Sequence, residues 1–88
     1  DSMAIGAMKV FQESGLSIPD DVSIIGFDDI EIASRIFPSL TTNAAPINDI
    51  AEKAVSLLLS AINGQDIEYQ HLILPAKLVT RMSCKSVQ

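Results

Sequence analysis

Apolar residues recur at helical spacing near the start of the chain. Ile5, Met8 and Phe11 are each three positions apart, so they fall on one side of a helix. Gly15 follows them, and glycine readily takes the left-handed conformation that ends a helix. The pattern predicts a helix over residues 2–14 that packs through one face.

A second helical stripe lies over residues 46–62. Pro46 suits the first position of a helix, and Gly64 stands where the helix would end. Seven apolar residues share its main face, namely Ile47, Ile50, Ala51, Ala54, Val55, Leu58 and Ile62. Because Leu57 and Leu59 lie off that face, we expect a helix that meets water on a narrow side only, or that packs against a second surface.

Elsewhere the pattern changes to short β-branched and apolar runs. Residues 22–27, VSIIGF, predict a strand that is covered on both faces. Residues 28–37 favour a short helix or turn, and the run LTTNA at 40–44 predicts a second strand. Two more extended pieces, joined at Pro75, are predicted over residues 69–83. This order of elements predicts an α/β fold with a mainly parallel sheet flanked by helices.

Size and charge limit what these residues can do. The 88 residues are 48% hydrophobic and 19% charged, which is typical of one globular domain at most. The net charge of −5 argues against a nucleic-acid surface, because phosphate binding needs clustered basic residues. The one close basic group is Lys77, Arg81 and Lys85. No signal peptide or membrane-spanning run is evident, and the first residue is not Met, so we expect a piece of a longer protein.

The chain has one cysteine, Cys84, and one histidine, His71. A lone cysteine cannot form an internal disulfide, which favours a reducing compartment. A Cys/His metal centre is excluded, and His71 in a strand-like run is interpreted as structural. We find neither a nucleophile beside a histidine base nor a glycine-rich phosphate loop. We therefore expect no enzymatic activity, no cofactor and no metal.

Two adjacent carboxylates, Asp28 and Asp29, follow the apolar run SIIGF. Three interpretations are open from the residues alone. The first is helix capping, because Asp28 and Glu31 have the spacing of a capping box, and Asp29 could cap instead. The second is a divalent cation site, which needs a third acidic ligand and a lysine from another strand. Asp49 and Glu52 lie on a predicted helix, and no lysine ends an apolar strand. The third is contact with a ligand in the crevice at the carboxyl ends of the strands, where a carboxylate accepts hydrogen bonds from hydroxyl or amino groups.

Four motifs occur in order over nearly the whole chain. They are D-x-MA-x-GAM, GL-x-x-P-x-DVSI-x-GFDD, P-x-LTT and LP-x-x-LV-x-R-x-S. The series closely resembles the C-terminal part of LacI/GalR-type bacterial transcriptional repressors. The resemblance implies that residues 1–88 are most of the C-terminal subdomain of an effector-binding core, with a type I periplasmic-binding-protein-like fold. A helix-turn-helix DNA-binding domain, a hinge helix and the N-terminal subdomain are then expected outside this chain.

The resemblance also implies roles for individual residues. The first aspartate of the family's DD pair faces the effector cleft and binds a sugar or purine, which gives that role to Asp28. Asp29 is then structural, as a cap or turn former. Asp1 is a candidate contact at the cleft edge, and Phe27 is a candidate for the cleft floor or the core. Ala45 occupies a cleft position that is often Gln in the family, and its side chain can neither donate nor accept.

A homodimer through this same subdomain is implied as well. The expected interface comprises residues 2–12 of the first helix and the segment 32–37. Its candidate residues are Ile5, Met8, Lys9, Ile32, Arg35, Ile36 and Phe37. Ile5 and Met8 are equally consistent with an ordinary core, whereas Lys9 and Arg35 would rim the interface.

The function expected from the resemblance is the effector-binding and dimerising part of a cytoplasmic, LacI-type transcriptional regulator. It would sense a small polar ligand, a sugar above all, in a cleft between two subdomains. The effector would shift the equilibrium between two closure states by its differential affinity for them. DNA would be bound only through the absent domain, and no membrane partner is expected. The alternative, from another functional class, is the sugar-binding component of a transport system, which shares the fold.

Overall fold

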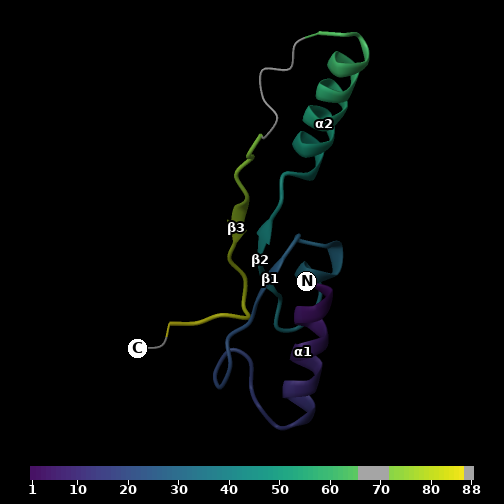
Figure 1. Ribbon diagram of the computed structural model, residues 1–88. Helices are drawn as coiled ribbons and strands as arrows, with labels where there is room; N and C mark the ends of the chain where they lie inside the picture. The colour runs from purple at the N-terminus through teal and green to yellow at the C-terminus, as the bar shows by residue number, and fades with distance from the viewer. Residues whose placement is uncertain (66–71, 87–88) are drawn as a thin grey trace. The chain divides into compact units, whose positions relative to one another are not determined.

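The computed structural model describes residues 1–65 and 72–86. The elements in chain order are α1 (Ser2–Glu13), β1 (Ile25–Phe27), the 3-10 helix η1 (Glu31–Ser34), β2 (Thr41–Ala44), α2 (Ile47–Ile62) and β3 (Lys77–Val79) (Figure 1). This arrangement confirms the predicted α/β class. The chain divides into two compact units, which are described separately below. One comprises Asp1–Ala45 with Lys77–Gln88, and the other comprises Pro46–Ala76.

The first unit contains a three-stranded sheet in the order β1-β2-β3. β1 and β2 are parallel, and Gly26 lies opposite Thr42. This pairing confirms that the segment between the two strands is a crossover. β2 and β3 are antiparallel, because the chain leaves β2 at Ala44 and re-enters the sheet opposite it, at Lys77. Over residues 1–65 and 72–86 the sheet is therefore mixed, whereas the sequence pattern predicted a mainly parallel one.

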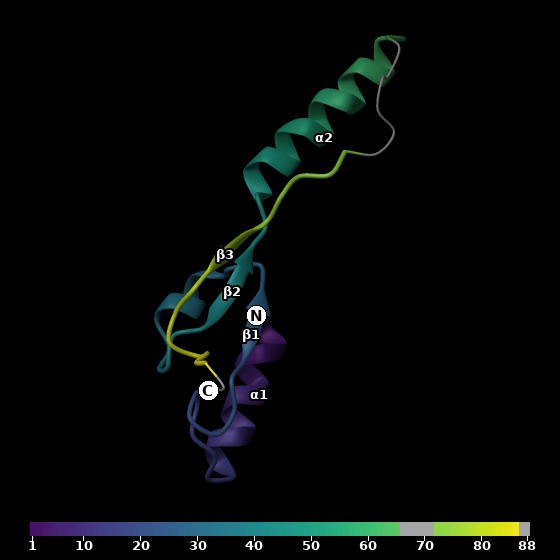
Figure 2. The same cartoon turned by 90° about the vertical axis from the view of Figure 1, so that its left-hand side faces the viewer.

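The core of the first unit lies where α1 and η1 meet the sheet. Its buried apolar residues are Met8, Ile18, Ala33 and Leu40, and Ala4, Ile5, Phe11, Ile24, Ile30 and Ile36 pack around them. α1 lies against β1 (Figure 2). The predicted stripe of α1 is thus confirmed as its packing face, and Gly15 ends the helix with a positive φ of 86°.

Strand β1 is shorter and more exposed than the sequence pattern predicted. It spans Ile25–Phe27 rather than residues 22–27, because the N–H of Ile24 donates to the carbonyl of Ser83 instead of to a ladder partner. Ile25 is 54% exposed and Phe27 is 53% exposed. The expectation of a strand covered on both faces is therefore wrong for the part of the chain that the structure describes.

The second unit is built on α2. The helix follows Pro46, and Gly64 comes after it with a positive φ of 73°, so both predicted ends are close to the observed ones. None of its residues is buried. The expectation of a helix wetted on a narrow side only is therefore wrong for the described residues of this unit, and packing of its apolar face against a further surface stays a prediction. A hollow of about 300 Å³ lies within this unit, lined by Ile50, Lys53, Ala54, Leu57, Leu72 and Leu74.

The last two extended pieces have different outcomes. The second one forms β3, which confirms a strand after Pro75. Residues 72–76 form no strand, so the first piece is wrong over those positions. His71 and the rest of that piece lie outside the described residues. No helix in the described ranges is long and apolar enough to cross a bilayer.

Candidate ligand site after strand β1

Asp28 and Asp29 follow β1 directly and have an unusual backbone conformation. Their φ angles are 106° and 58°, so two consecutive residues with side chains lie in the left-handed half of conformational space. Such a conformation costs about 1–3 kcal/mol per residue and persists only where the surroundings impose it. Aspartate tolerates it better than most residues. The neighbouring strand and helix should therefore hold this turn in place.

Three consecutive main-chain N–H groups of this turn have acceptors in the chain. Asp28 donates to the carbonyl of Asn43 at 2.8 Å. Asp29 donates to Oγ1 of Thr42 at 3.4 Å, and Ile30 donates to Oδ2 of Asp1 at 2.8 Å. The acceptors come from β2 and from the residue before α1. The turn is consequently tied to both elements, and none of these three amides is left for a ligand.

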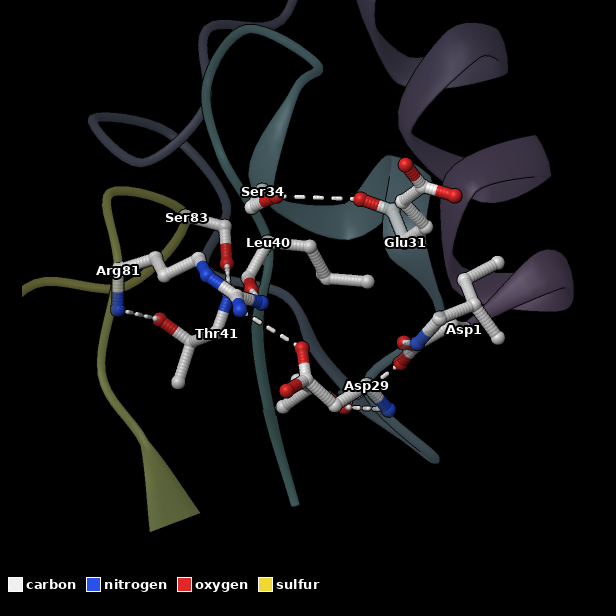
Figure 3. A network of polar contacts seen from close by, with 10 residues as sticks. Asp1, Asp29, Glu31, Ser34, Leu40, Thr41, Arg81 and Ser83 are labelled. Atoms are coloured by element: carbon white, nitrogen blue, oxygen red, sulfur yellow. Dashed lines mark hydrogen bonds and ion pairs between the residues drawn. The ribbon is translucent and has the colours of Figure 1, made fainter. Parts of the chain in front are cut away.

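The Asp29 carboxylate pairs with Arg81 (Figure 3). Nη2 of Arg81 lies 2.7 Å from Oδ1 of Asp29, and the two side chains are only 16% and 28% exposed. Nη1 of Arg81 donates to the carbonyl of Leu40 at 2.9 Å. The main-chain N–H of Arg81 donates to Oγ1 of Thr41 at 2.9 Å. Asp29 therefore has a structural partner 52 residues away in the sequence.

Capping is the wrong interpretation of the carboxylate pair. The 3-10 helix begins at Glu31, and its N-cap residue is Ile30, with no side-chain capping bond. The capping box of Asp28 with Glu31 does not form, and Asp29 binds Arg81 instead of capping. The divalent cation interpretation gains no support either, because no group of three potential metal ligands exists among the residues that the structure describes.

Asp1 connects α1 to the turn and to β2. Its Oδ1 accepts from the hydroxyl of Thr42 at 2.7 Å, and its Oδ2 accepts from the N–H of Ile30. Its main-chain nitrogen donates to the carbonyl of Phe27 at 2.8 Å. Asp1 occupies the N-cap position of α1, yet its side chain makes no capping bond there. Both carboxylate oxygens are engaged within the chain, while the contact of Asp1 with a ligand stays a prediction.

Asp28 differs from its two acidic neighbours. Its side chain is exposed, and no hydrogen bond or ion pair to its carboxylate is found within residues 1–65 and 72–86. Its own N–H is held by the carbonyl of Asn43. A fixed main chain thus carries a carboxylate with free acceptor capacity. Such a carboxylate can accept hydrogen bonds from hydroxyl or amino groups, and contact of Asp28 with a ligand stays a prediction.

The other predicted ligand-site residues lie at the same edge of the sheet. Phe27 ends β1 and is half exposed, and Ala45 follows β2 and is half-buried. Because β1 and β2 are parallel and Phe27 pairs with Asn43, the carboxyl ends of both strands lie side by side. Ligands of open α/β sheets bind outside such strand ends. The structure therefore brings Phe27, Asp28 and Ala45 to one edge.

The predicted interface residues line two adjoining hollows of the first unit. One, of about 310 Å³, is lined by Ile5, Met8, Lys9, Gln12, Ile36 and Phe37. The other, of about 440 Å³, is lined by Glu31, Ile32, Arg35 and Ile36. Met8 is buried and belongs to the core, whereas Phe37 is 83% exposed. The structure thus brings the seven predicted residues together with Gln12, which ends the predicted interface helix segment, and adds Glu31, which the sequence did not indicate. The dimer itself stays a prediction.

Comparison with known proteins identifies the domain. Residues 1–84 match the family model of the periplasmic binding protein-like domain. The chain is 42% identical to the lactose operon repressor of Rhizobium radiobacter over 85 residues, covering 97% of this chain and 74% of the repressor. It is 43% identical to the HTH-type transcriptional repressor MelR of Bacillus subtilis (strain 168) over 84 residues, covering 96% of this chain but 24% of MelR.

A solved structure gives the same answer for the fold. The periplasmic binding protein/LacI transcriptional regulator from Alkaliphilus metalliredigens QYMF, complexed with D-xylulofuranose, is 37% identical and superposes with a TM-score of 0.89. The match covers 98% of this chain and 32% of that one, so the chain spans about a third of this neighbour. The family motifs, the family model and the superposition agree. The chain belongs to the LacI/GalR family of transcriptional regulators, within its periplasmic-binding-protein-like domain.

Proposed function

We propose that residues 1–88 are the effector-sensing and dimerising part of a transcriptional regulator, and that the effector is an uncharged sugar. The observation that carries this proposal is the Asp28 carboxylate. It is exposed at the carboxyl end of a parallel strand pair and has no partner in the described residues. A sugar hydroxyl that donates to an ionised carboxylate gains about 1.5–3 kcal/mol per bond.

The charges around Asp28 favour an uncharged ligand over a phosphorylated one. Arg81 pairs with Asp29, the neighbour of Asp28, and its guanidinium is already bound to Asp29 and to the carbonyl of Leu40. An anionic ligand beside Asp28 would face an unbalanced negative charge, which is costly. The solved relatives contain D-xylulofuranose, ribose and lactose, which are all uncharged sugars.

The relatives support a regulator over a transport component. The curated proteins most similar to the chain include repressors of lactose and ribose operons. The proposed location is accordingly the cytoplasm, and no enzymatic activity is proposed. With a net charge of −5, and with Arg81 and Lys85 each paired with an aspartate, this surface suits DNA poorly. We assign DNA contact to a part of the protein outside residues 1–88.

The proposed mechanism is a shift between two states of the effector-binding core. A sugar that binds Asp28 better in one state raises the population of that state by its differential affinity. The groove of Ile5, Lys9, Ile36 and Phe37 would connect two copies, so that both respond together. In this mechanism Asp28 contacts the ligand, and the groove contacts the second copy of the chain.

Calorimetric titration of the intact protein tests the proposal. D-xylulose, D-ribose and lactose serve as probes, and Asp28→Ala is compared with Asp20→Ala. Loss of two hydrogen bonds at Asp28 should weaken the tightest-binding sugar by about 100-fold or more. Asp20 is an exposed carboxylate paired with Lys85, so its removal should leave the affinity unchanged. Equal affinities for the Asp28→Ala variant and the unmodified protein would refute the proposed site.

A further inference from the structure

We propose that Arg81 is a positioning residue, which sets the direction of the Asp28 carboxylate through its ion pair with Asp29. The inference rests on the proposed role of Asp28 as the sugar contact. Arg81 itself need not touch the ligand. Its part is to fix the turn that carries the ligand-binding group.

Arg81 is anchored at both ends of its side chain (Figure 3). Its main-chain N–H donates to Oγ1 of Thr41, and its Nη1 donates to the carbonyl of Leu40, each at 2.9 Å. Leu40 is fully buried and Thr41 is nearly so. The guanidinium therefore has a fixed place beside the start of β2. Nη2, the remaining engaged nitrogen, lies 2.7 Å from Asp29, so the Asp29 carboxylate is fixed in turn.

The direction of the Asp28 side chain follows from the two peptide groups that flank it. The peptide N–H before its Cα donates to the carbonyl of Asn43. The peptide N–H after its Cα belongs to Asp29 and donates to Oγ1 of Thr42 at 3.4 Å, which is a long bond. With that bond long, the Arg81 pair is the stronger restraint on Asp29 and on its positive φ of 58°. Fixing both peptide planes fixes the Cα–Cβ bond of Asp28.

The ion pair of Arg35 with Glu31 shows why the position of Arg81 matters. Its N–O distance is also 2.7 Å, but its side chains are 72% and 77% exposed, and the residues are four apart on one short segment. That pair restrains only its own turn. The Arg81 pair connects the segment after β3 to the turn after β1, and a guanidinium can serve two acceptors in one plane where an ammonium serves them poorly.

Hydrogen exchange of the intact protein, read by mass spectrometry, tests the restraint without any ligand. In Arg81→Lys and in Asp29→Asn, amides 28–30 should exchange about tenfold faster, while the amides of α1 keep their rates. The matched control is Asp20→Asn, which breaks the exposed ion pair with Lys85 and should change neither segment. Unchanged exchange at residues 28–30 in Arg81→Lys would overturn the proposed positioning role.

Sugar affinity tests whether the restraint acts through Asp28. The probe is the tightest binder among D-xylulose, D-ribose and lactose, titrated up to millimolar concentration. Arg81→Lys should weaken binding about tenfold when Asp28 is present and less than about twofold in the Asp28→Ala background. Equal losses of sugar affinity in the two backgrounds would mean that Arg81 affects binding independently of Asp28, and would overturn the inference. Asp28→Ala without any loss would instead refute the proposed function, whatever the exchange rates show.

Discussion

The carboxylate of Asp1 occupies the space beside Gly26 that a side chain at position 26 would need. A Cβ atom on Gly26 would overlap Oδ1 of Asp1 and would lie 2.9 Å from Cδ2 of Leu40. Gly26 thus stands in β1 because another chain segment approaches its backbone closely, and not because a turn needs its conformational freedom. The close approach lets the Asp1 carboxylate reach Thr42 and Ile30.

Gly26→Ala should therefore destabilise the fold. The added methyl group would displace Asp1 and press on the buried Leu40, at a cost of about 1–3 kcal/mol in the free energy of unfolding. Thermal denaturation followed by circular dichroism measures it. Gly6→Ala is the matched control, because a Cβ there meets no atom within 4 Å. In α1 that alanine should stabilise the helix by up to about 1 kcal/mol. A stabilised Gly26→Ala would contradict the proposed packing.

Ser83→Ala should also destabilise the fold, because its hydroxyl serves buried main chain. Ser83 is fully buried, and its Oγ accepts from the N–H of Thr41 at 2.9 Å and donates to the carbonyl of Ile24. Without the hydroxyl, the buried N–H of Thr41 loses its acceptor, which costs about 1–3 kcal/mol. Urea denaturation provides the measurement. In Ser34→Ala the lost hydroxyl is exposed, and the change should stay within about 0.5 kcal/mol. Equal effects of the two substitutions would argue against the buried role.

Phe37→Glu should weaken the proposed dimer. Phe37 is 83% exposed and lines the groove between α1 and the segment after η1, so a charge there would face an apolar partner surface. Sedimentation velocity should show the dimer dissociating at concentrations at least tenfold higher than in the unmodified protein. Val10→Glu, on α1 but outside the residues that line the groove, serves as the control and should leave the dimer intact. If Phe37→Glu sediments as the unmodified dimer does, the interface lies elsewhere.

A peptide of residues 46–65 should be weakly helical in water. α2 has no buried residue, and isolated helices of this length are marginal because nucleation is costly. Circular dichroism should show little helix in water and a clear gain on addition of trifluoroethanol. A strongly helical spectrum in water would mean that α2 is stable through its own propensity and needs no packing partner.

Local patterns predicted the elements that depend on neighbouring residues. Gly15 and Gly64 both ended helices as expected, because left-handed glycine is a local property. The run LTTNA gave β2, and its parallel pairing with β1 followed from the crossover length. These features depend on residues close in sequence, or on chain length alone. A single sequence is sufficient for them.

Contacts between distant residues were not predictable from the same patterns. The ion pair of Asp29 with Arg81 joins residues 52 positions apart, and nothing near either residue indicates it. Sequence alone predicts a cap or turn former at Asp29, because these are the common local uses of aspartate, and its turn conformation agrees with the second role. The positive φ of Asp28 likewise depends on β2, which holds its amide. Structural roles of charged residues were therefore the part of the site that the sequence could not supply.

The sequence pattern overestimated the burial of β1 and α2 for a related reason. An apolar run predicts that a face will be covered, but it does not say which residues cover it. Ile25 and the apolar stripe of α2 remain accessible in the described part of the chain. The apolar pattern of β1 and α2 thus predicts which faces of these elements are apolar, but it does not predict which residues cover those faces.

The saturated amides at residues 28–30 have a kinetic consequence. Since their hydrogen bonds are made with β2 and Asp1, departure of the proposed sugar would leave no backbone donor of the turn unpaired and would require no refolding of the turn. Occupancy of the proposed site would then follow a rising or falling sugar concentration as fast as diffusion and domain movement permit. The occupancy of such a site would therefore report the present sugar concentration and not an earlier one.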